Sequence, residues 1–231
     1  MKVALLADIH ANLPALNSIV KSKSFKSCDM VIVAGDLIGY YFWPSQVIEI
    51  IIECADYVIA GNHEEMLTQG LADREMLLMN SRKYGSGLQK CLSDLSTTQL
   101  HWLQSLPQTQ DIRLDEGSIL VCHGSVIRND EYVYPDSPLD PFIDYLSMGT
   151  KWVVSGHTHY PMHRIHKGVA FINPGSVGQP RNGEKGAHWA VLNTELNTVD
   201  FHIENYDYIS VATIAQNLHP EIPYLSNVLL R

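Results

Sequence analysis

Five short blocks of the chain concentrate histidine, aspartate and asparagine, the residue types that bind divalent metals and transfer protons. They are Asp8-Ile9-His10, Gly35-Asp36, Gly61-Asn62-His63-Glu64, His123-Gly124 and Gly156-His157-Thr158-His159. Imidazole and carboxylate groups suit manganese, iron, zinc, nickel and related ions. If the blocks meet in space, they supply ligands for two divalent cations about 3.5–4 Å apart. The competing interpretation is that they are five unrelated polar loops.

An apolar run precedes each block, and these runs predict the strands that would position the polar residues. The runs cover residues 2–7, 30–34, 57–60, 118–122 and 151–155. Continuous aliphatic runs of this length are typical of strands buried on both faces. In open α/β sheets, ligands bind at the carboxyl ends of the strands. We therefore expect the five blocks to share one edge, which argues against unrelated polar loops.

Spacing within the blocks predicts which side chains converge. Residues two apart in an extended segment face the same side, so we expect Asp8 and His10 to converge, and likewise His157 and His159. Asp36 has a central place from which its carboxylate could bridge two ions. Two bound cations would contribute four positive charges against two negative charges from the aspartates, so the site would attract anions.

The remaining pattern predicts one α/β domain over 1–231. Helical spacing over 13–23 and 45–54, between the early runs, predicts a β-α-β-α-β opening on a mainly parallel central sheet. Residues at about 64–106 read as a helical insertion, with "STTQ" as a capping start. Further strands are expected in "MHRIH", "VAFIN", "HWAVLN" and "VDFHI", with Lys167-Gly168 as a hairpin turn, and a last helix over about 208–218.

Composition limits the partners. The net charge is −9 and no lysine or arginine cluster offsets it, which argues against nucleic acid or a membrane surface as a partner. No stretch is long and apolar enough to cross a bilayer, and the four cysteines are scattered without a CxxC pair. We expect a cytoplasmic protein, for which a homo-oligomer is compatible with the sequence.

In this order, the blocks closely resemble the signature of the calcineurin-like metallophosphoesterases: D-x-H, G-D, G-N-H-[E/D], H and G-H-x-H. The stretch "NPGSVGQPR" at 173–181 is similar to the smaller bacterial and archaeal, phosphodiesterase-type branch of that superfamily. The resemblance implies a layered α/β/β/α sandwich with mixed central sheets and helices outside.

The resemblance also implies roles for individual residues. One metal would be held by Asp8, His10, Asp36 and His159, and the second by Asp36, Asn62, His123 and His157. His63 matches the family's catalytic histidine, which would protonate or stabilise the leaving oxygen. A metal-bridging hydroxide would attack the phosphorus.

One departure from the large protein-phosphatase branch concerns substrate binding. That branch continues its second block as G-D-x-x-D-R, whereas this chain reads "GDLIGYYFWP" and lacks the arginine. Arg181 is therefore our candidate for binding phosphate, with Arg128 in reserve. Tyr40 or Tyr41 could stack on a nucleobase, although packing is the alternative role. Residues 125–140 are expected to overhang the site.

These observations favour a metal-dependent phosphoesterase acting on small phosphodiester, phosphomonoester or nucleotide substrates. A dinucleoside polyphosphate hydrolase is a second hypothesis, and a nuclease fits less well because no basic groove is visible. A non-catalytic, metal-binding interaction scaffold is the hypothesis from a different class. Retention of every ligand and of His63 favours catalysis.

Overall fold

The computed structural model describes residues 1–231 and contains two mixed sheets of five strands each. The first sheet, in spatial order, contains β10 (Thr198–Glu204), β9 (Ala187–Asn193), β1 (Lys2–Leu6), β2 (Met30–Val33) and β3 (Tyr57–Val58). The second contains β4 (Thr109–Leu114), β5 (Gly117–Cys122), β6 (Thr150–Val154), β8 (Val169–Asn173) and β7 (Met162–His166). The five strands expected before the polar blocks all exist, but they are divided between two sheets.

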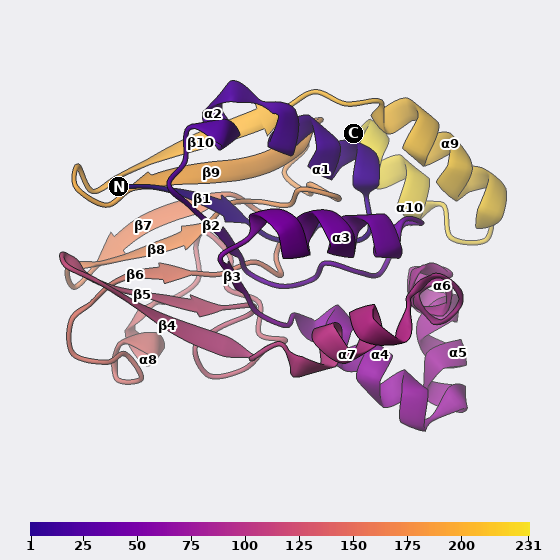
Figure 1. The fold of residues 1–231 in the computed structure, drawn as a ribbon, viewed down its shortest axis with the longest axis horizontal. Helices are drawn as coiled ribbons and strands as arrows, with labels where there is room; N and C mark the ends of the chain where they lie inside the picture. Colours follow the sequence, from indigo (N-terminus) through magenta and orange to yellow (C-terminus); the bar gives the residue numbers. More distant parts are fainter.

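The two sheets pack face to face, and helices lie outside them (Figure 1). The inward residues of β1, including Val3 and Leu5, share a buried core with Trp152 and Ile172 of the opposite sheet. This core arises because side chains alternate along a strand, so the other residues of β1 face outward to the helices. The layered α/β/β/α fold is confirmed, whereas a single, mainly parallel sheet is wrong: β1, β2 and β3 pair in parallel, but β9 and β10 join them antiparallel.

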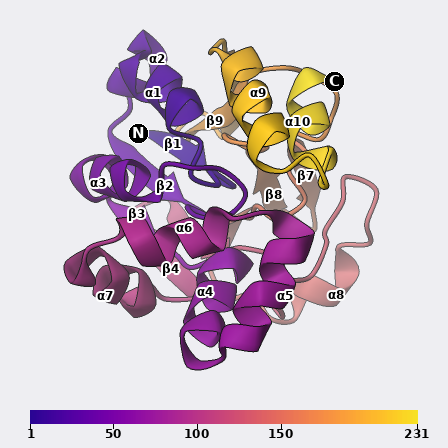
Figure 2. The same ribbon diagram turned by 90° about the vertical axis from the view of Figure 1, so that its right-hand side faces the viewer.

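The helices cover the outer faces and gather at one end of the sandwich. They are α1 (Leu13–Lys21), α2 (Lys23–Lys26), α3 (Pro44–Cys54), α4 (Asn62–Ala72), α5 (Arg74–Tyr84), α6 (Gly87–Asp94), α7 (Thr97–Ser105), α8 (Asp140–Ile143), α9 (Tyr208–Leu218) and α10 (Tyr224–Asn227), followed by a 3₁₀ turn at Val228–Leu230. Helices α1 and α3 pack on the outer face of the first sheet. Helices α4–α7 and α9–α10 lie at the end opposite the N-terminus (Figures 1 and 2).

Local signals explain several boundaries. Helix α7 begins with a capping box. Ser96 Oγ accepts a hydrogen bond from the Gln99 backbone N–H, and Gln99 Oε1 accepts one from the Ser96 backbone N–H. The β7–β8 hairpin turns at Lys167 and Gly168, whose φ angles of 48° and 82° suit the tight turn of a two-residue hairpin. No helix has the length and apolar character needed to cross a membrane.

Candidate active site

Loops from both sheets meet at their carboxyl ends and bring the predicted ligands together. Asp8 follows β1, Asp36 follows β2 and Asn62 begins α4, so three loops come from the first sheet. His123 follows β5 and His157 follows β6, so two come from the second. Their side chains are all buried. The site therefore lies across the two sheets, where their strand ends converge.

Several residues that carry the candidate ligands have positive φ angles, in the left-handed region of backbone conformation. The extended backbone expected at these residues is therefore wrong. The φ angles are 54° at Asp8, 51° at His10, 54° at Asp36, 67° at His157 and 62° at His159. A non-glycine residue adopts this conformation at a cost, and such residues cluster at functional sites where the surroundings impose it. Here backbone bonds between loops impose it: the Asp8 amide donates to Gly35 at 3.1 Å and the His10 amide to Asp36 at 2.9 Å.

His157 and His159 consequently face different neighbours. His159 Nε2 lies 3.1 Å from His10 Nε2, whereas the His157 ring packs 5.2 Å from that of His123. Three groups of side chains place ligand atoms within 4.8 Å of one another: Asp8 with His10 and His159, Asp36 with His123 and His157, and His10 with Asp36 and His63. The first two correspond to the two predicted sets of ligands.

Backbone carbonyls fix three of the imidazoles in one tautomer. The Nδ1–H groups of His10, His123 and His159 donate to the carbonyls of Ile38 at 3.0 Å, Ala34 at 2.7 Å and Gln179 at 2.6 Å. A carbonyl can only accept, so Nδ1 carries the proton and Nε2 presents a lone pair in the neutral ring. This is the usual support of a metal-binding histidine.

Two of the lone pairs face each other: His10 Nε2 lies 3.1 Å from His159 Nε2. His123 differs, because without a cation its ring is protonated, and its Nε2–H lies 3.1 Å from Asn62 Oδ1 and 3.2 Å from Asp36 Oδ2. Asp8 Oδ2 and His157 Nε2 are buried and have no hydrogen-bond partner. Acceptors converging without donors repel one another, and cations between them would remove the conflict. The residues therefore fit divalent metal ions.

The titration of these groups reflects the same crowding. Burial, opposed by the charge of His123 and reinforced by that of Asp36, raises the pKa of Asp8 to about 7. Burial lowers the pKa of His123, but the charges of Asp36 and Asp8 outweigh it and raise the pKa to about 10. Burial lowers the pKa of both His10 and His159 well below its usual value, which keeps them neutral and able to bind a metal.

His63 lies beside the two ligand sets. Its backbone amide donates to Asp36 Oδ1 at 2.8 Å, and its ring packs 4.8 Å from those of His10 and Tyr40. The Nδ1 atom is buried without a partner, and burial lowers the pKa of the imidazole. His63 also lines the cavity above the ligands, and an imidazole is the group that most often acts as an acid or base in catalysis.

Glu64 has a positioning role that sequence reasoning did not find. Its carboxylate accepts from the backbone amides of Gly61 at 2.7 Å, Asp36 at 2.9 Å and Ile38 at 3.1 Å. It therefore joins the start of α4 to the loop that carries Asp36, and Ile38 in turn anchors His10. The one signal in the sequence is a glutamate at the third position of α4, where a capping box places it.

Two side chains of the stretch 173–181 form hydrogen bonds to the backbone of the ligand-bearing loops. Asn173 donates to the Gly156 carbonyl at 2.6 Å, and Ser176 Oγ donates to the Asp8 carbonyl at 2.8 Å. Both side chains are buried, so they fix backbone rather than line the cavity.

Above the ligands, a cavity of about 30 Å³ is enclosed by the aromatic rings of Tyr40, Tyr84 and Tyr132 and by Arg181. Arg181 Nη2 donates to Tyr40 Oη and to Gln179 Oε1, each at 3.2 Å, while its Nε is buried without a partner. A guanidinium that lines the cavity beside the ligands is suited by its charge to an anionic oxygen. Sequence reasoning missed Tyr84, which lies in a helix, and identified Tyr132 only as part of the overhanging loop.

Two predicted substrate-binding residues lie away from this cavity. Tyr41 is fully buried among residues of α9 and α10 and donates to the Leu225 carbonyl at 3.2 Å. Arg128 has 64% of its side chain exposed and pairs with Asp130 at 2.9 Å. Tyr40 and Arg181 thus lie at the cavity, whereas Tyr41 packs the fold and Arg128 lines a neighbouring groove.

Comparisons with known proteins agree with this geometry. A calcineurin-like phosphoesterase superfamily domain matches residues 1–197. An uncharacterized protein of Methanocaldococcus jannaschii is 27% identical over 220 residues, 87% of this chain and 85% of the relative. Phosphodiesterase YfcE of Escherichia coli is 22% identical over 227 residues, 94% of this chain and 99% of the relative.

Solved structures show the same fold. A metallophosphoesterase from Sphaerobacter thermophilus has a TM-score of 0.80 and 23% identity and covers 100% of this chain and 99% of its own. A hypothetical protein from Pyrococcus horikoshii has a TM-score of 0.82 and 21% identity, with coverage of 99% and 97%. The family resemblance is confirmed: the chain belongs to the calcineurin-like phosphoesterase superfamily.

Proposed function

We propose that this protein is a phosphoesterase that requires two divalent metal ions and hydrolyses small phosphodiesters, phosphomonoesters or nucleotides. One observation supports the proposal: three histidines tied through Nδ1 to backbone carbonyls turn their Nε2 atoms toward one another and toward Asp36 and Asp8. Two divalent cations among these groups would satisfy all of them at once, with release of the His123 proton. Manganese, iron, zinc and nickel all suit the ligand types.

Asp8, Asp36, His10 and His159 would hold one ion, and Asp36, Asn62, His123 and His157 the other. Bound there, two divalent cations lower the pKa of a water molecule and neutralise charge developing on phosphorus. The protein's own residues orient the ester. Arg181 would donate to a phosphoryl oxygen, and His63 would give a proton to the leaving oxygen.

Size and charge support a small substrate. A cavity of about 30 Å³ has room for about two water-sized species, so the bulk of a substrate must lie outside it. The chain carries a net charge of −9, which opposes a long polyanion and makes a nuclease a poor candidate. Dinucleoside polyphosphate hydrolysis remains an alternative substrate preference. The four cysteines are free thiols, which supports a reducing compartment such as the cytoplasm.

The test is hydrolysis of bis-p-nitrophenyl phosphate with Mn²⁺, followed as nitrophenolate release, by the wild-type protein, His63→Ala and the matched surface variant His101→Ala. We expect turnover that requires metal. On a diester with an alkyl leaving group, kcat should be lower by about 10²–10⁴-fold in His63→Ala, since proton transfer typically contributes that much, and on the nitrophenyl ester the loss should be smaller because nitrophenolate needs little protonation. Unchanged turnover in a chelator would contradict the proposal. Metal-loaded protein inactive on diesters, monoesters and dinucleoside polyphosphates would instead favour the interaction scaffold.

A further inference from the structure

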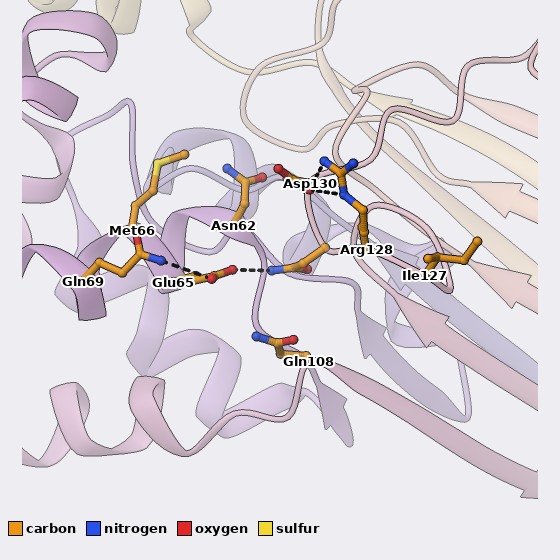
Figure 3. Close-up of a pocket in the computed structure, with 9 residues that line it drawn as sticks. Asn62, Glu65, Met66, Gln69, Gln108, Ile127, Arg128 and Asp130 are labelled. Atoms are coloured by element: carbon orange, nitrogen blue, oxygen red, sulfur yellow. Dashed lines mark hydrogen bonds and ion pairs between the residues drawn. The ribbon is translucent and has the colours of Figure 1, made fainter. Parts of the chain in front are cut away.

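A second, larger hollow adjoins the metal-ligand cavity. It lies between helix α4 and the loop at residues 127–130 and has a volume of about 390 Å³ (Figure 3). Asn62, a proposed metal ligand, lines both this groove and the smaller cavity. A group attached to a phosphate at the metals could therefore extend past Asn62 into the groove. The volume falls within the range of small-molecule sites, about 300–1,000 Å³.

The groove is lined mainly by polar side chains that leave it without excess positive charge. Arg128 is paired with Asp130 at 2.9 Å, which neutralises its charge. Glu65 accepts from Gln69 at 3.2 Å and from Asn129 at 3.5 Å, and both contacts are drawn in Figure 3. One guanidinium against two carboxylates gives a net charge of about −1, which disfavours a second phosphate or a carboxylate.

Several hydrogen-bonding groups in the groove are unused within the protein. The Gln108 side chain lies at the groove with no protein partner. Gln69 has one side-chain bond, that to Glu65. The carboxamides of Gln69 and Gln108 each offer donors and an acceptor, which matches hydroxyl groups that themselves both donate and accept.

The two sides of Asn62 differ in chemistry. On one side, His63 packs against the rings of Tyr40 and Tyr84 at 4.8 and 5.4 Å. His63 does not line the groove, so the leaving group belongs on the aromatic side. The groove is then left for the second substituent of a phosphodiester, the one that stays on phosphorus.

We propose that this groove binds an uncharged, hydroxyl-rich substituent of the substrate, such as glycerol or a sugar, through Gln69 and Gln108. The proposal rests on the phosphoesterase function and narrows its substrates to diesters with a polyol on one side. The carboxamides hydrogen-bond the hydroxyls, and Met66 and Ile127 supply apolar contact for the carbon skeleton.

The experiment compares two substrates with the same leaving group, glyceryl p-nitrophenyl phosphate and methyl p-nitrophenyl phosphate, in the Mn²⁺-loaded protein. Because the leaving group is shared, the ratio of their kcat/KM values reports contacts to the second substituent. We expect the wild-type protein to prefer the glyceryl ester by at least about ten-fold, since each hydrogen bond gained is worth roughly five-fold. Failure to cleave both esters would refute the phosphodiesterase activity on which the polyol site rests, whereas equal kcat/KM values would refute the polyol site alone.

Variants locate the contact. Gln69→Leu and Gln108→Leu should each lower the glyceryl-to-methyl ratio about five-fold, and the double variant should bring it near one. Gln216→Leu, an exposed residue of α9, is the matched control and should keep the wild-type ratio. An unchanged ratio in the double variant would overturn the assignment to this groove. Preference for p-nitrophenyl phosphorylcholine over the glyceryl ester would overturn the assignment to an uncharged polyol.

Discussion

Replacing Glu64 perturbs the site without removing a proposed metal ligand. Glu64 is 3% exposed, and its carboxylate accepts three hydrogen bonds from the backbone N–H groups of Gly61, Asp36 and Ile38. Glu64→Ala leaves these donors unsatisfied in the interior. A buried donor without a partner costs about 1–3 kcal/mol, and the lower value applies where water can enter the vacated space.

Three donors at about 1 kcal/mol each lower the free energy of unfolding by about 3 kcal/mol. For a chain of this length, this corresponds to a fall in Tm of about 6–12 °C. Glu64→Gln keeps an oxygen for the two amides that share Oε2 and turns an NH₂ group toward Ile38. We expect its loss to be about 1 kcal/mol, or about 2–4 °C.

The assay is thermal unfolding of metal-free protein, paired with titration calorimetry of Mn²⁺ binding. The affinity for Mn²⁺ should be lower in Glu64→Gln than in the wild-type protein and lowest in Glu64→Ala, because Glu64 fixes both the Asp36 loop and the peptide that anchors His10. Glu65→Ala is the control, since it removes the same charge from the same turn of α4 but is exposed. A Glu64→Ala protein whose Tm and Mn²⁺ affinity match those of Glu65→Ala would refute the positioning role.

Other variants and one titration test the remaining assignments. Arg181→Met should raise the KM for phosphate esters about ten-fold, whereas Arg128→Met should change the KM for methyl p-nitrophenyl phosphate far less; equal effects would refute Arg181 as the phosphate-binding residue. Tyr40→Phe should raise KM by releasing Arg181, whereas Tyr41→Phe should lower Tm by about 2–4 °C and leave KM unchanged; a KM effect at Tyr41 would contradict its packing role. The pKa of His123, raised to about 10, means that its ring is protonated in the metal-free protein at pH 7.5, so Mn²⁺ binding should release at least one proton per chain, and this release should decrease as the pH approaches 10. Calorimetry in buffers of different ionisation enthalpy measures the release, and none at pH 7.5 would contradict that protonation state.

Strand positions could be predicted from the sequence because buried strands need continuous apolar runs. Residues 30–34 and 118–122 are such runs, and they form β2 and β5. Strand β4 was missed because it lies at the edge of its sheet, where Thr109–Leu114 buries only Ile112. Edge strands carry polar residues on exposed positions, so they lack the hydrophobic signal.

The clustering of the candidate site residues was also predictable, but their geometry was not. Asp8 and His10 were assigned an extended backbone because the preceding strand is extended, yet both are left-handed. That conformation results from bonds to residues 35 and 36, which are distant in sequence and belong to another loop. The division of the strand ends between two sheets is likewise a tertiary property, since the apolar runs before His10 and His123 look alike.

The most direct test of the metal site is the anomalous diffraction of crystals soaked in Zn²⁺, collected at the zinc edge. We expect two peaks about 3.5–4 Å apart with the Asp36 carboxylate between them. His10 and His159 should bind one ion, and His123 and His157 the other, through Nε2 at about 2.0–2.1 Å. No peak among these residues, or a single ion that leaves His123 and His157 unbound, would contradict the account.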